Sequence, residues 1–161
     1  MLSIHRLKDG GLRIALNPDF AATLQELPER LRRVLARSDF TDRVTRRLFP
    51  RAYQEEEEEK EAEYRKLLGD DLLKHKLESV KAFERTLKNW EESRRKIRLD
   101  IGADDFELWL GFVNDMRIVL GTELDIRDDS WEHDFDPSHP QAEDVALLHC
   151  LGWLQESLLK A

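Results

Sequence analysis

The chain has 161 residues, of which 40% are apolar and 37% charged, with few glycines and prolines and a net charge of −8. This length suits one domain, residues 1–161, with a substantial core, and the composition favours helices. The acidic balance argues against general affinity for nucleic acid or anionic membranes. No apolar run is long enough to span a bilayer and no signal peptide is visible, so we expect a cytoplasmic protein without membrane contact.

The N-terminal residues predict a β-hairpin. Residues 2–7 and 12–16 alternate in the manner of strands, and the turn sequence KDGG lies between them. An isolated hairpin is marginal in water, so it must pack on helices or pair with a second copy. Residues 17–161 are expected to form a helical bundle, which makes the fold class mainly α with a small N-terminal hairpin.

Two helices are expected next in the chain. The first begins at Asn17-Pro18, a cap followed by proline at the first helical position, and Pro28 is expected to kink or restart it. The second is short, is capped by Thr41 and ends at Leu48.

The arginine-rich segment 30–51 allows two interpretations. A basic surface that includes Arg43, Arg46 and Arg47 would bind nucleic acid or an acidic partner. Alternatively, the arginines neutralise the acidic run that follows at 55–59. We favour neutralisation, because no interleaved aromatic residues or glycine-rich loop accompany the arginines.

A pair of helices is expected between residues 55 and 96. A charged helix covers 55–68, and Gly69-Asp70-Asp71 is expected to break and recap the chain. A longer helix with a narrow apolar stripe then runs from about Leu72 to Lys96, a pattern typical of a bundle. Residues 97–101 are expected to be a short extended link.

The stretch from residue 104 to residue 124 predicts the central helix of the fold. Its apolar residues cover an arc of about 200°, too wide for a surface helix. Arg117 falls inside this arc, with Asn114 one turn earlier near the edge, whereas Asp115 is expected to face solvent. A guanidinium facing a core needs a carboxylate or several carbonyls as partners. We therefore expect a structural Arg117–carboxylate pair in preference to a ligand site.

An irregular, exposed loop is expected at about 125–140. It contains the weak metal-ligand candidates His133, Asp136 and His139. Their spacing matches neither the calcium-loop pattern nor the helical zinc-binding pattern with two histidines four residues apart. We therefore expect no metal ion and no cofactor.

The last helix is expected from about residue 141 to residue 159, with a leucine stripe toward the core. Gln155 lies inside this stripe and needs a hydrogen-bond partner there. Trp153 lies well off the stripe on a face of small residues, which suits another helix of this chain or of a second copy. Cys150 is the single cysteine, so it cannot form an intramolecular disulfide. It shares the face with Trp153 and is therefore expected to be buried and inert.

Five segments of the chain resemble a known family in their order and spacing. They are LFPRAY at 48–53, EAEYRKL at 61–67, GDDL at 69–72, NDMRIVLGTELD at 114–125 and LGWLQESL at 151–158. The family is an actinobacterial domain of unknown function that includes the actinomycete oxidative stress regulator AosR. No catalytic residues are established for it. Its matching positions are therefore treated as family-motif residues of unknown role: Asn114, Arg117, Gly121, Trp153, Gln155 and Glu156.

The resemblance, the helical build and the lack of a catalytic constellation favour a non-enzymatic regulatory protein that acts through protein contacts, and by the resemblance a stress-response transcriptional regulator. The face with Trp153 favours a homodimer. Some relatives are described as redox-responsive transcriptional regulators that work with a sigma factor, and family genes often lie beside that of the ClpS protease adaptor. The implied partner is therefore a sigma factor or the ClpS-linked proteolysis machinery. Redox-switching relatives rely on two nearby cysteines, whereas Cys150 stands alone here. The alternatives are direct DNA binding through residues 30–51 and, after it, a metal-binding protein or an enzyme.

Overall fold

The computed structural model describes residues 3–37, 41–50, 57–126, 138 and 140–161. The fold is mainly α, as the sequence predicts. In chain order its elements are β1 (Ser3–Arg6), β2 (Leu12–Leu16), α1 (Pro18–Leu35), α2 (Arg43–Leu48), α3 (Glu58–Lys88), β3 (Glu91–Ser93), β4 (Lys96–Ile101), the 3-10 turn η1 (Ala103–Asp105), α4 (Phe106–Glu123) and α5 (Ala142–Lys160).

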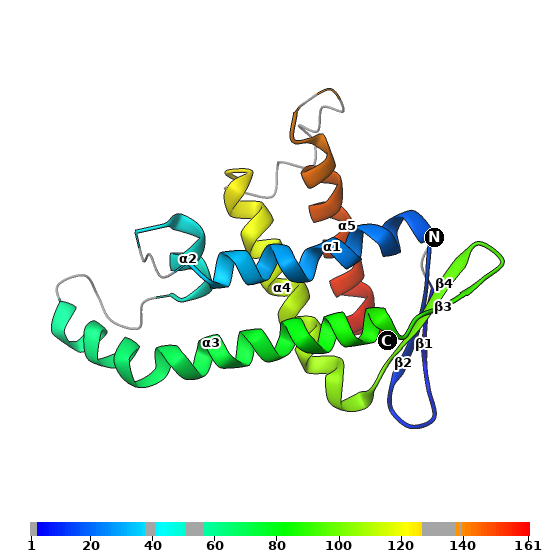
Figure 1. Ribbon diagram of the computed structural model, residues 1–161, viewed down its shortest axis with the longest axis horizontal. Helices are drawn as coiled ribbons and strands as arrows, with labels where there is room; N and C mark the ends of the chain where they lie inside the picture. The colour runs from blue at the N-terminus through cyan, green and yellow to red at the C-terminus, as the bar shows by residue number, and fades with distance from the viewer. Residues whose placement is uncertain (1–2, 38–40, 51–56, 127–137, 139) are drawn as a thin grey trace.

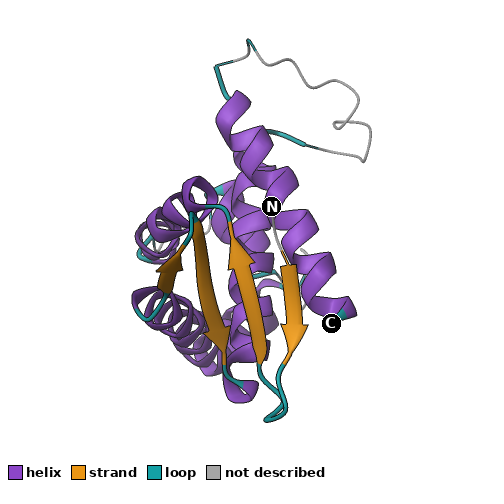
Figure 2. Cartoon of the chain, turned by 90° about the vertical axis from the view of Figure 1, so that its right-hand side faces the viewer, coloured by secondary structure: helices purple, strands orange, loops and turns teal. Residues whose placement is uncertain are grey.

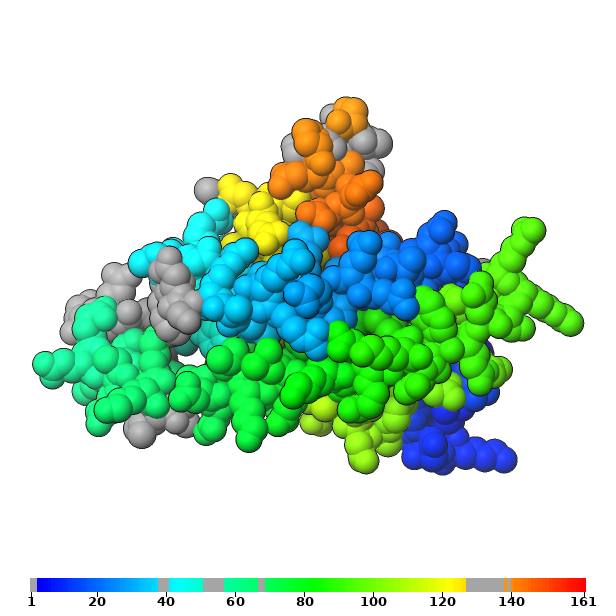
Figure 3. All heavy atoms as spheres, viewed as in Figure 1, coloured from blue at the N-terminus to red at the C-terminus, as the bar shows by residue number. Residues whose placement is uncertain are grey.

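Helix α4 is the centre of the helical layer, as its wide apolar arc predicts. It contacts α1, α2, α3 and α5, and its side chains Trp109, Phe112 and Met116 are fully buried. Figure 1 shows α1 and α3 running along the longest axis, with the sheet at one end. Helix α5 packs chiefly on α4, and its first turns project from the body (Figures 1 and 3). No helix within the described ranges is both long enough and apolar enough to cross a membrane.

The predicted hairpin of β1 and β2 is confirmed, but it forms half of a four-stranded antiparallel sheet in the order β1-β2-β4-β3. Figure 2 looks onto this sheet, with helices covering its far face. On the outer face, Arg13 of β2 pairs with Asp100 of β4 at 2.8 Å. On the inner face, buried apolar residues pair across the two strands, namely Leu12 with Ile101, Ile14 with Leu99, and Leu16 with Ile97.

The prediction of a helix to Lys96 is wrong, because α3 ends at Lys88 and the chain then forms the β3–β4 hairpin. Strand β4 alternates exposed and buried residues, and this period of two belongs to a strand. The turn is made by Arg94 and Arg95, with φ of 47° and 67°. Glycine or asparagine usually occupies this left-handed region, and arginine is uncommon there. Because two arginines form this turn, the sequence carries no turn signal between β3 and β4.

Two helices continue through residues that were predicted to interrupt them. Helix α1 is unbroken at Pro28, whose side chain is buried, and α3 passes Gly69 and the two aspartates after it without a break. A glycine costs about 1 kcal/mol and a proline about 3 kcal/mol in a helix interior. We infer that packing of α1 and α3 against each other and against α4 offsets these local costs.

The helix starts are confirmed in part. Asn17 caps α1 by accepting a hydrogen bond from the Asp19 backbone N–H at 2.7 Å. Helix α2 is capped by Asp42, not by Thr41, and the Asp42 carboxylate accepts from the Thr45 backbone N–H at 3.1 Å. A carboxylate at this position also complements the positive end of the helix dipole.

Replacement of Gly11 tests the pairing of β2 with β4. A Cβ at Gly11 would lie 2.7 Å from the carbonyl oxygen of Ile101, so Gly11→Ala should lower the free energy of unfolding by about 1 to 3 kcal/mol. Gly102→Ala is the matched control, because an added Cβ there meets no atom within 4 Å. Urea denaturation measures both variants. Equal stability of the two would contradict the pairing described here.

Candidate functional site

Four of the six family-motif residues meet at one surface cavity of about 500 Å³ between α4 and α5. Arg117 comes from α4, whereas Trp153, Gln155 and Glu156 come from α5. These three residues span one turn of α5, and Glu156 lies between Gln155 and Trp153 around the helix. The remaining wall is formed by Leu148, His149, Gly152 and Leu159.

The half-buried side chain of Arg117 lies against α5 at Gly152. A Cβ added to Gly152 would lie 3.5 Å from Arg117 Nη2 and 3.6 Å from its Cζ, which are ordinary van der Waals distances, so the guanidinium lies directly over this glycine. Arg117 Nη1 donates a hydrogen bond to Gln155 Oε1 at 2.6 Å. The expectation that Gln155 has a hydrogen-bond partner is confirmed. The expected pair of Arg117 with a carboxylate is wrong within the described residues, because Arg117 binds a neutral amide.

The guanidinium of Arg117 is incompletely satisfied by the described residues. Its Nε is buried and donates no hydrogen bond to them. A buried donor without an acceptor costs about 1 to 3 kcal/mol. Arg30, by comparison, binds Asp144 at 3.0 Å and Glu123 at 2.8 Å. The cavity between α4 and α5 therefore contains a cation that can still donate hydrogen bonds to an anionic ligand.

The other two motif residues of α4 lie outside this cavity. Asn114 is exposed three positions before Arg117, and Gly121 lies four positions after it. These spacings place all three on one side of α4. A Cβ at Gly121 would meet no atom within 4 Å, and its carbonyl accepts a hydrogen bond from the Ile126 N–H at 2.9 Å.

The face of α5 that carries Trp153 is exposed. Trp153 is 46% exposed and Leu159 is 64% exposed, and Cys150 also lies at the surface. The prediction that Cys150 is buried is wrong, because α4 covers the leucine stripe of α5 and no described element covers the face with Trp153. Apart from Leu72 of α3, these two are the exposed large hydrophobic residues of the described chain.

Arginines of the 30–51 segment pair with carboxylates from several elements. The predicted partners at 55–59 are wrong for three of them, because tertiary packing brings other acids closer. Arg46 and Arg47 lie exposed on α2, and no ion pair of either is seen within the described residues. The pairs are Arg30 with Asp144 and Glu123, Arg32 with Glu84, and Arg43 with Asp125.

The metal-ligand candidates His133, Asp136 and His139 lie outside the described residues. Within the described ranges, histidine, cysteine, aspartate and glutamate form no group of three or more that could hold a metal ion.

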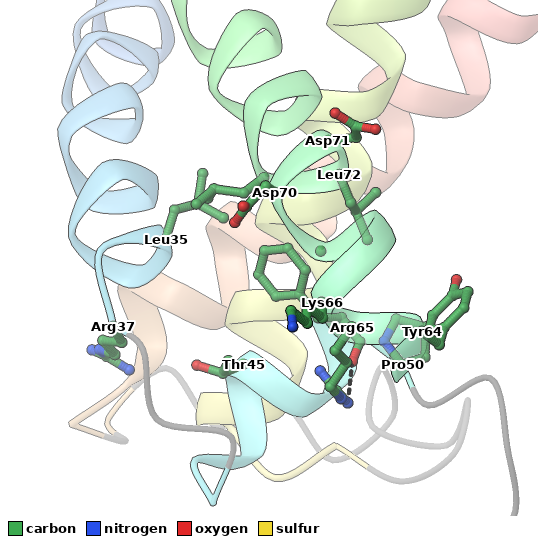
Figure 4. A pocket seen from close by; sticks show the side chains of 13 residues that line it. Leu35, Arg37, Thr45, Pro50, Tyr64, Arg65, Lys66, Asp70, Asp71 and Leu72 are labelled. Atoms are coloured by element: carbon green, nitrogen blue, oxygen red, sulfur yellow. Dashed lines mark hydrogen bonds between the residues drawn. The ribbon is translucent and has the colours of Figure 1, made fainter. Parts of the chain in front are cut away.

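A second cavity of about 610 Å³ lies between the end of α1, α2 and the first half of α3 (Figure 4). Its walls combine apolar side chains such as Leu35 and Leu73 with charged ones such as Lys66 and Asp70. Arg65 donates a hydrogen bond to the Phe49 carbonyl at 3.1 Å, which Figure 4 marks as a dashed line. The volume suits a small molecule. The motifs at 48–53, 61–67 and 69–72 all contribute to this wall, whereas the other two motifs meet at Arg117.

A buried ion pair lies next to this second cavity. Lys76 of α3 donates to Asp115 of α4 at 2.9 Å, and Lys76 Nζ lies 5.8 Å from the centroid of the Phe49 ring. The prediction that Asp115 faces solvent is wrong, because α3 packs across that edge of α4. Burial raises the pKa of the Asp115 carboxyl, and the charge and hydrogen bond of Lys76 oppose this rise.

The comparison with known proteins adds one finding. A family model described as Domain of unknown function (DUF2017) matches residues 2–161. No curated protein and no solved structure matches the chain. The description of the family names no activity, so function has to be argued from the geometry.

Lys76→Met tests the buried ion pair. The variant leaves the Asp115 carboxylate buried without its partner, so the free energy of unfolding should fall by about 3 to 5 kcal/mol at neutral pH. Because the pKa of Asp115 is raised on folding, this group favours the folded state at low pH and loses that contribution as the pH rises through its folded pKa. The loss in Lys76→Met should therefore shrink as the pH falls toward about 4, where protonation removes the unpaired charge.

Two controls accompany this measurement by chemical denaturation. Lys88→Met removes a cation that is 74% exposed and should leave stability nearly unchanged. The double variant Lys76→Met/Asp115→Leu should recover most of the lost stability, because it removes both charges. A loss below about 1 kcal/mol in Lys76→Met at neutral pH would show that the pair is not the buried partnership described.

Proposed function

The chain belongs to the DUF2017 family, and we propose that it is a non-enzymatic regulatory protein that acts through contacts made by the outer face of α5. The observation that carries this proposal is the exposure of Trp153, at 46%, on the rim of the Arg117 cavity. We define the outer face of α5 by its exposed residues His149, Cys150, Trp153, Glu156 and Leu159.

An exposed tryptophan beside an exposed leucine is the kind of surface that a partner covers. A tryptophan buries about 150 to 250 Å² when it is enclosed, and tryptophan is enriched among the residues that dominate binding energy. Glu156 and Lys160 pair at 3.0 Å beside Trp153 and Leu159. Apolar groups surrounded by polar ones are typical of protein interaction sites. The outer face of α5 has this composition.

The motif resemblance supports a more specific role within this proposal. The family that includes AosR suggests a stress-response transcriptional regulator of actinobacterial type that works in the cytoplasm. A sigma factor and the ClpS-linked proteolysis machinery are then the first partners to test. A second copy of the chain is also a partner to test, because a two-fold axis would bring the outer faces of two α5 helices together.

Direct DNA binding through α2 is the second candidate function. The exposure of Arg46 and Arg47 on one short helix favours it, whereas the net charge of −8 and the Arg43–Asp125 pair at 2.9 Å oppose it. Phosphate contacts by these arginines would make binding sensitive to salt. A gel shift at low salt, with Arg46→Ala/Arg47→Ala as the comparison, decides this candidate. Absence of a shift removes it.

Trp153→Ala tests the proposed function. Because the side chain is half-exposed, its loss should change the free energy of unfolding by only about 1 kcal/mol, whereas the Kd of the partner should rise about tenfold or more. Affinity purification from the host with the full chain identifies the partner, and calorimetry then measures its Kd.

Leu72→Ala is the matched control, because Leu72 is also an exposed large hydrophobic residue, at 37%, but lies on α3. It should retain the partner with unchanged Kd. Two outcomes would count against the proposal. One is equal partner retention by Trp153→Ala and the unchanged chain, and the other is a strict monomer that retains no protein.

A further inference from the structure

We propose that Arg117 and Gln155 form a carboxylate-binding subsite for an aspartate or glutamate side chain of the protein segment that docks against Trp153. The subsite rests on the proposed function, because it specifies the chemistry of the partner at the outer face of α5. All the residues that form it belong to described parts of α4 and α5.

Arg117 lacks the carboxylate partner that comparable arginines have within the described residues. Five arginines are half-buried in the described chain, and four of these pair with a carboxylate. Arg117 instead donates to the neutral Gln155 amide, and no ion pair of Arg117 is seen in the described chain. A guanidinium away from water is best satisfied by a carboxylate, which accepts two parallel hydrogen bonds from its fork. The four pairs are Arg13 with Asp100, Arg30 with Asp144 and Glu123, Arg32 with Glu84, and Arg65 with Glu61.

Hydrogen-bond donors from both helices remain at the cavity. Gln155 uses its carbonyl oxygen to accept from Arg117 Nη1, so its amide nitrogen keeps two N–H donors. Arg117 Nη2 adds further donors and is held against Gly152, at 3.5 Å from the position of an added Cβ. Two helices therefore supply donors to the same cavity, and only acceptors would complete them.

The charges around the subsite allow an anion to enter. Among the described residues, Glu156 is the carboxylate that lines the cavity, and it already pairs with Lys160 at 3.0 Å. His149 also lines the cavity and adds no negative charge. The positive charge of Arg117 is thus the uncompensated charge at this place, and it favours an acidic group on the partner.

An apolar surface lies beside these donors. The cavity is lined by Trp153, Leu159 and Leu148 together with Arg117. An occupant that carries an apolar side chain next to its carboxylate would therefore bind with the most favourable free energy. The outer face of α5 from His149 to Leu159 is about 15 Å long at the helical rise. Arg117 lies against Gly152, inside this length and not at either end, where an internal residue of a docked segment would lie. This position favours an acidic side chain over the carboxylate at a chain end.

Selection from a library of random twelve-residue peptides tests the subsite on the purified full chain. Peptides that bind should carry aspartate or glutamate within about one helical turn of an aromatic or aliphatic residue. For a selected peptide, replacement of its acidic residue by the corresponding amide should weaken binding to the unchanged chain about tenfold or more. Against Arg117→Gln, the same replacement should weaken binding less than about twofold, because the interaction it removes is already absent.

Matched variants keep the result interpretable. Arg46→Gln makes the same chemical change at an exposed arginine of α2 and should behave like the unchanged chain. Arg117→Lys keeps the charge but loses the fork, so its binding should be intermediate. Arg117→Lys replaces Arg117→Gln in the binding comparison if circular dichroism shows that Arg117→Gln does not fold.

Failure of the subsite differs from failure of the proposed function. If the selected peptides need Trp153 but the acid-to-amide replacement weakens binding equally for the unchanged chain and Arg117→Gln, the subsite is overturned and the docking face stands. Selection of no peptide also overturns the subsite. If Trp153→Ala binds the selected peptides as tightly as the unchanged chain does, the outer face of α5 is not the docking surface, and both proposals fail.

Discussion

The apolar surface of α4 has to be covered from several directions, and the arrangement of the other helices follows from this requirement. Phe83 of α3 stacks on Phe112 with ring centroids 3.9 Å apart and lies 4.4 Å from the Trp109 ring. The Trp109 indole N–H donates to the Thr86 hydroxyl at 3.2 Å, so even the polar atom of this buried ring is satisfied. Helices α1, α2 and α5 cover the remaining sides of α4.

The same central helix carries two charged residues at different edges, and their surroundings give them different roles. Asp115 faces α3, where Lys76 pairs with it in a buried contact. Arg117 faces α5, where a neutral amide and a glycine meet it beside an open cavity. A closed ion pair fixes how two helices pack, whereas a cation with unused donors at a surface can recognise a ligand. The contact between α4 and α5 is therefore the better candidate for function.

The motif segments are dispersed along the chain but gather at two places in the fold. Those at 48–53, 61–67 and 69–72 line the larger cavity between α1, α2 and α3, and those at 114–125 and 151–158 meet around Arg117. Helical periodicity predicts which side of its own helix a residue occupies. It does not predict which helix faces that side, so neither cavity could be assembled from the sequence. Arg117 and Gln155 could each be identified as polar residues on apolar faces, but their contact with each other could not.

The sequence by itself determined the local features of this protein, namely the first hairpin, the cap of α1 at Asn17, the wide apolar arc of α4 and the leucine stripe of α5. Each depends on residues close together in the chain, whose spacing decides which surface is apolar. Only the tertiary structure decided the pairing of β2 with β4, the passage of α1 through Pro28, and the burial of Asp115 together with the exposure of Trp153. These features depend on contacts between distant segments, whose packing and hydrogen bonds outweigh local preferences of about 1 to 3 kcal/mol.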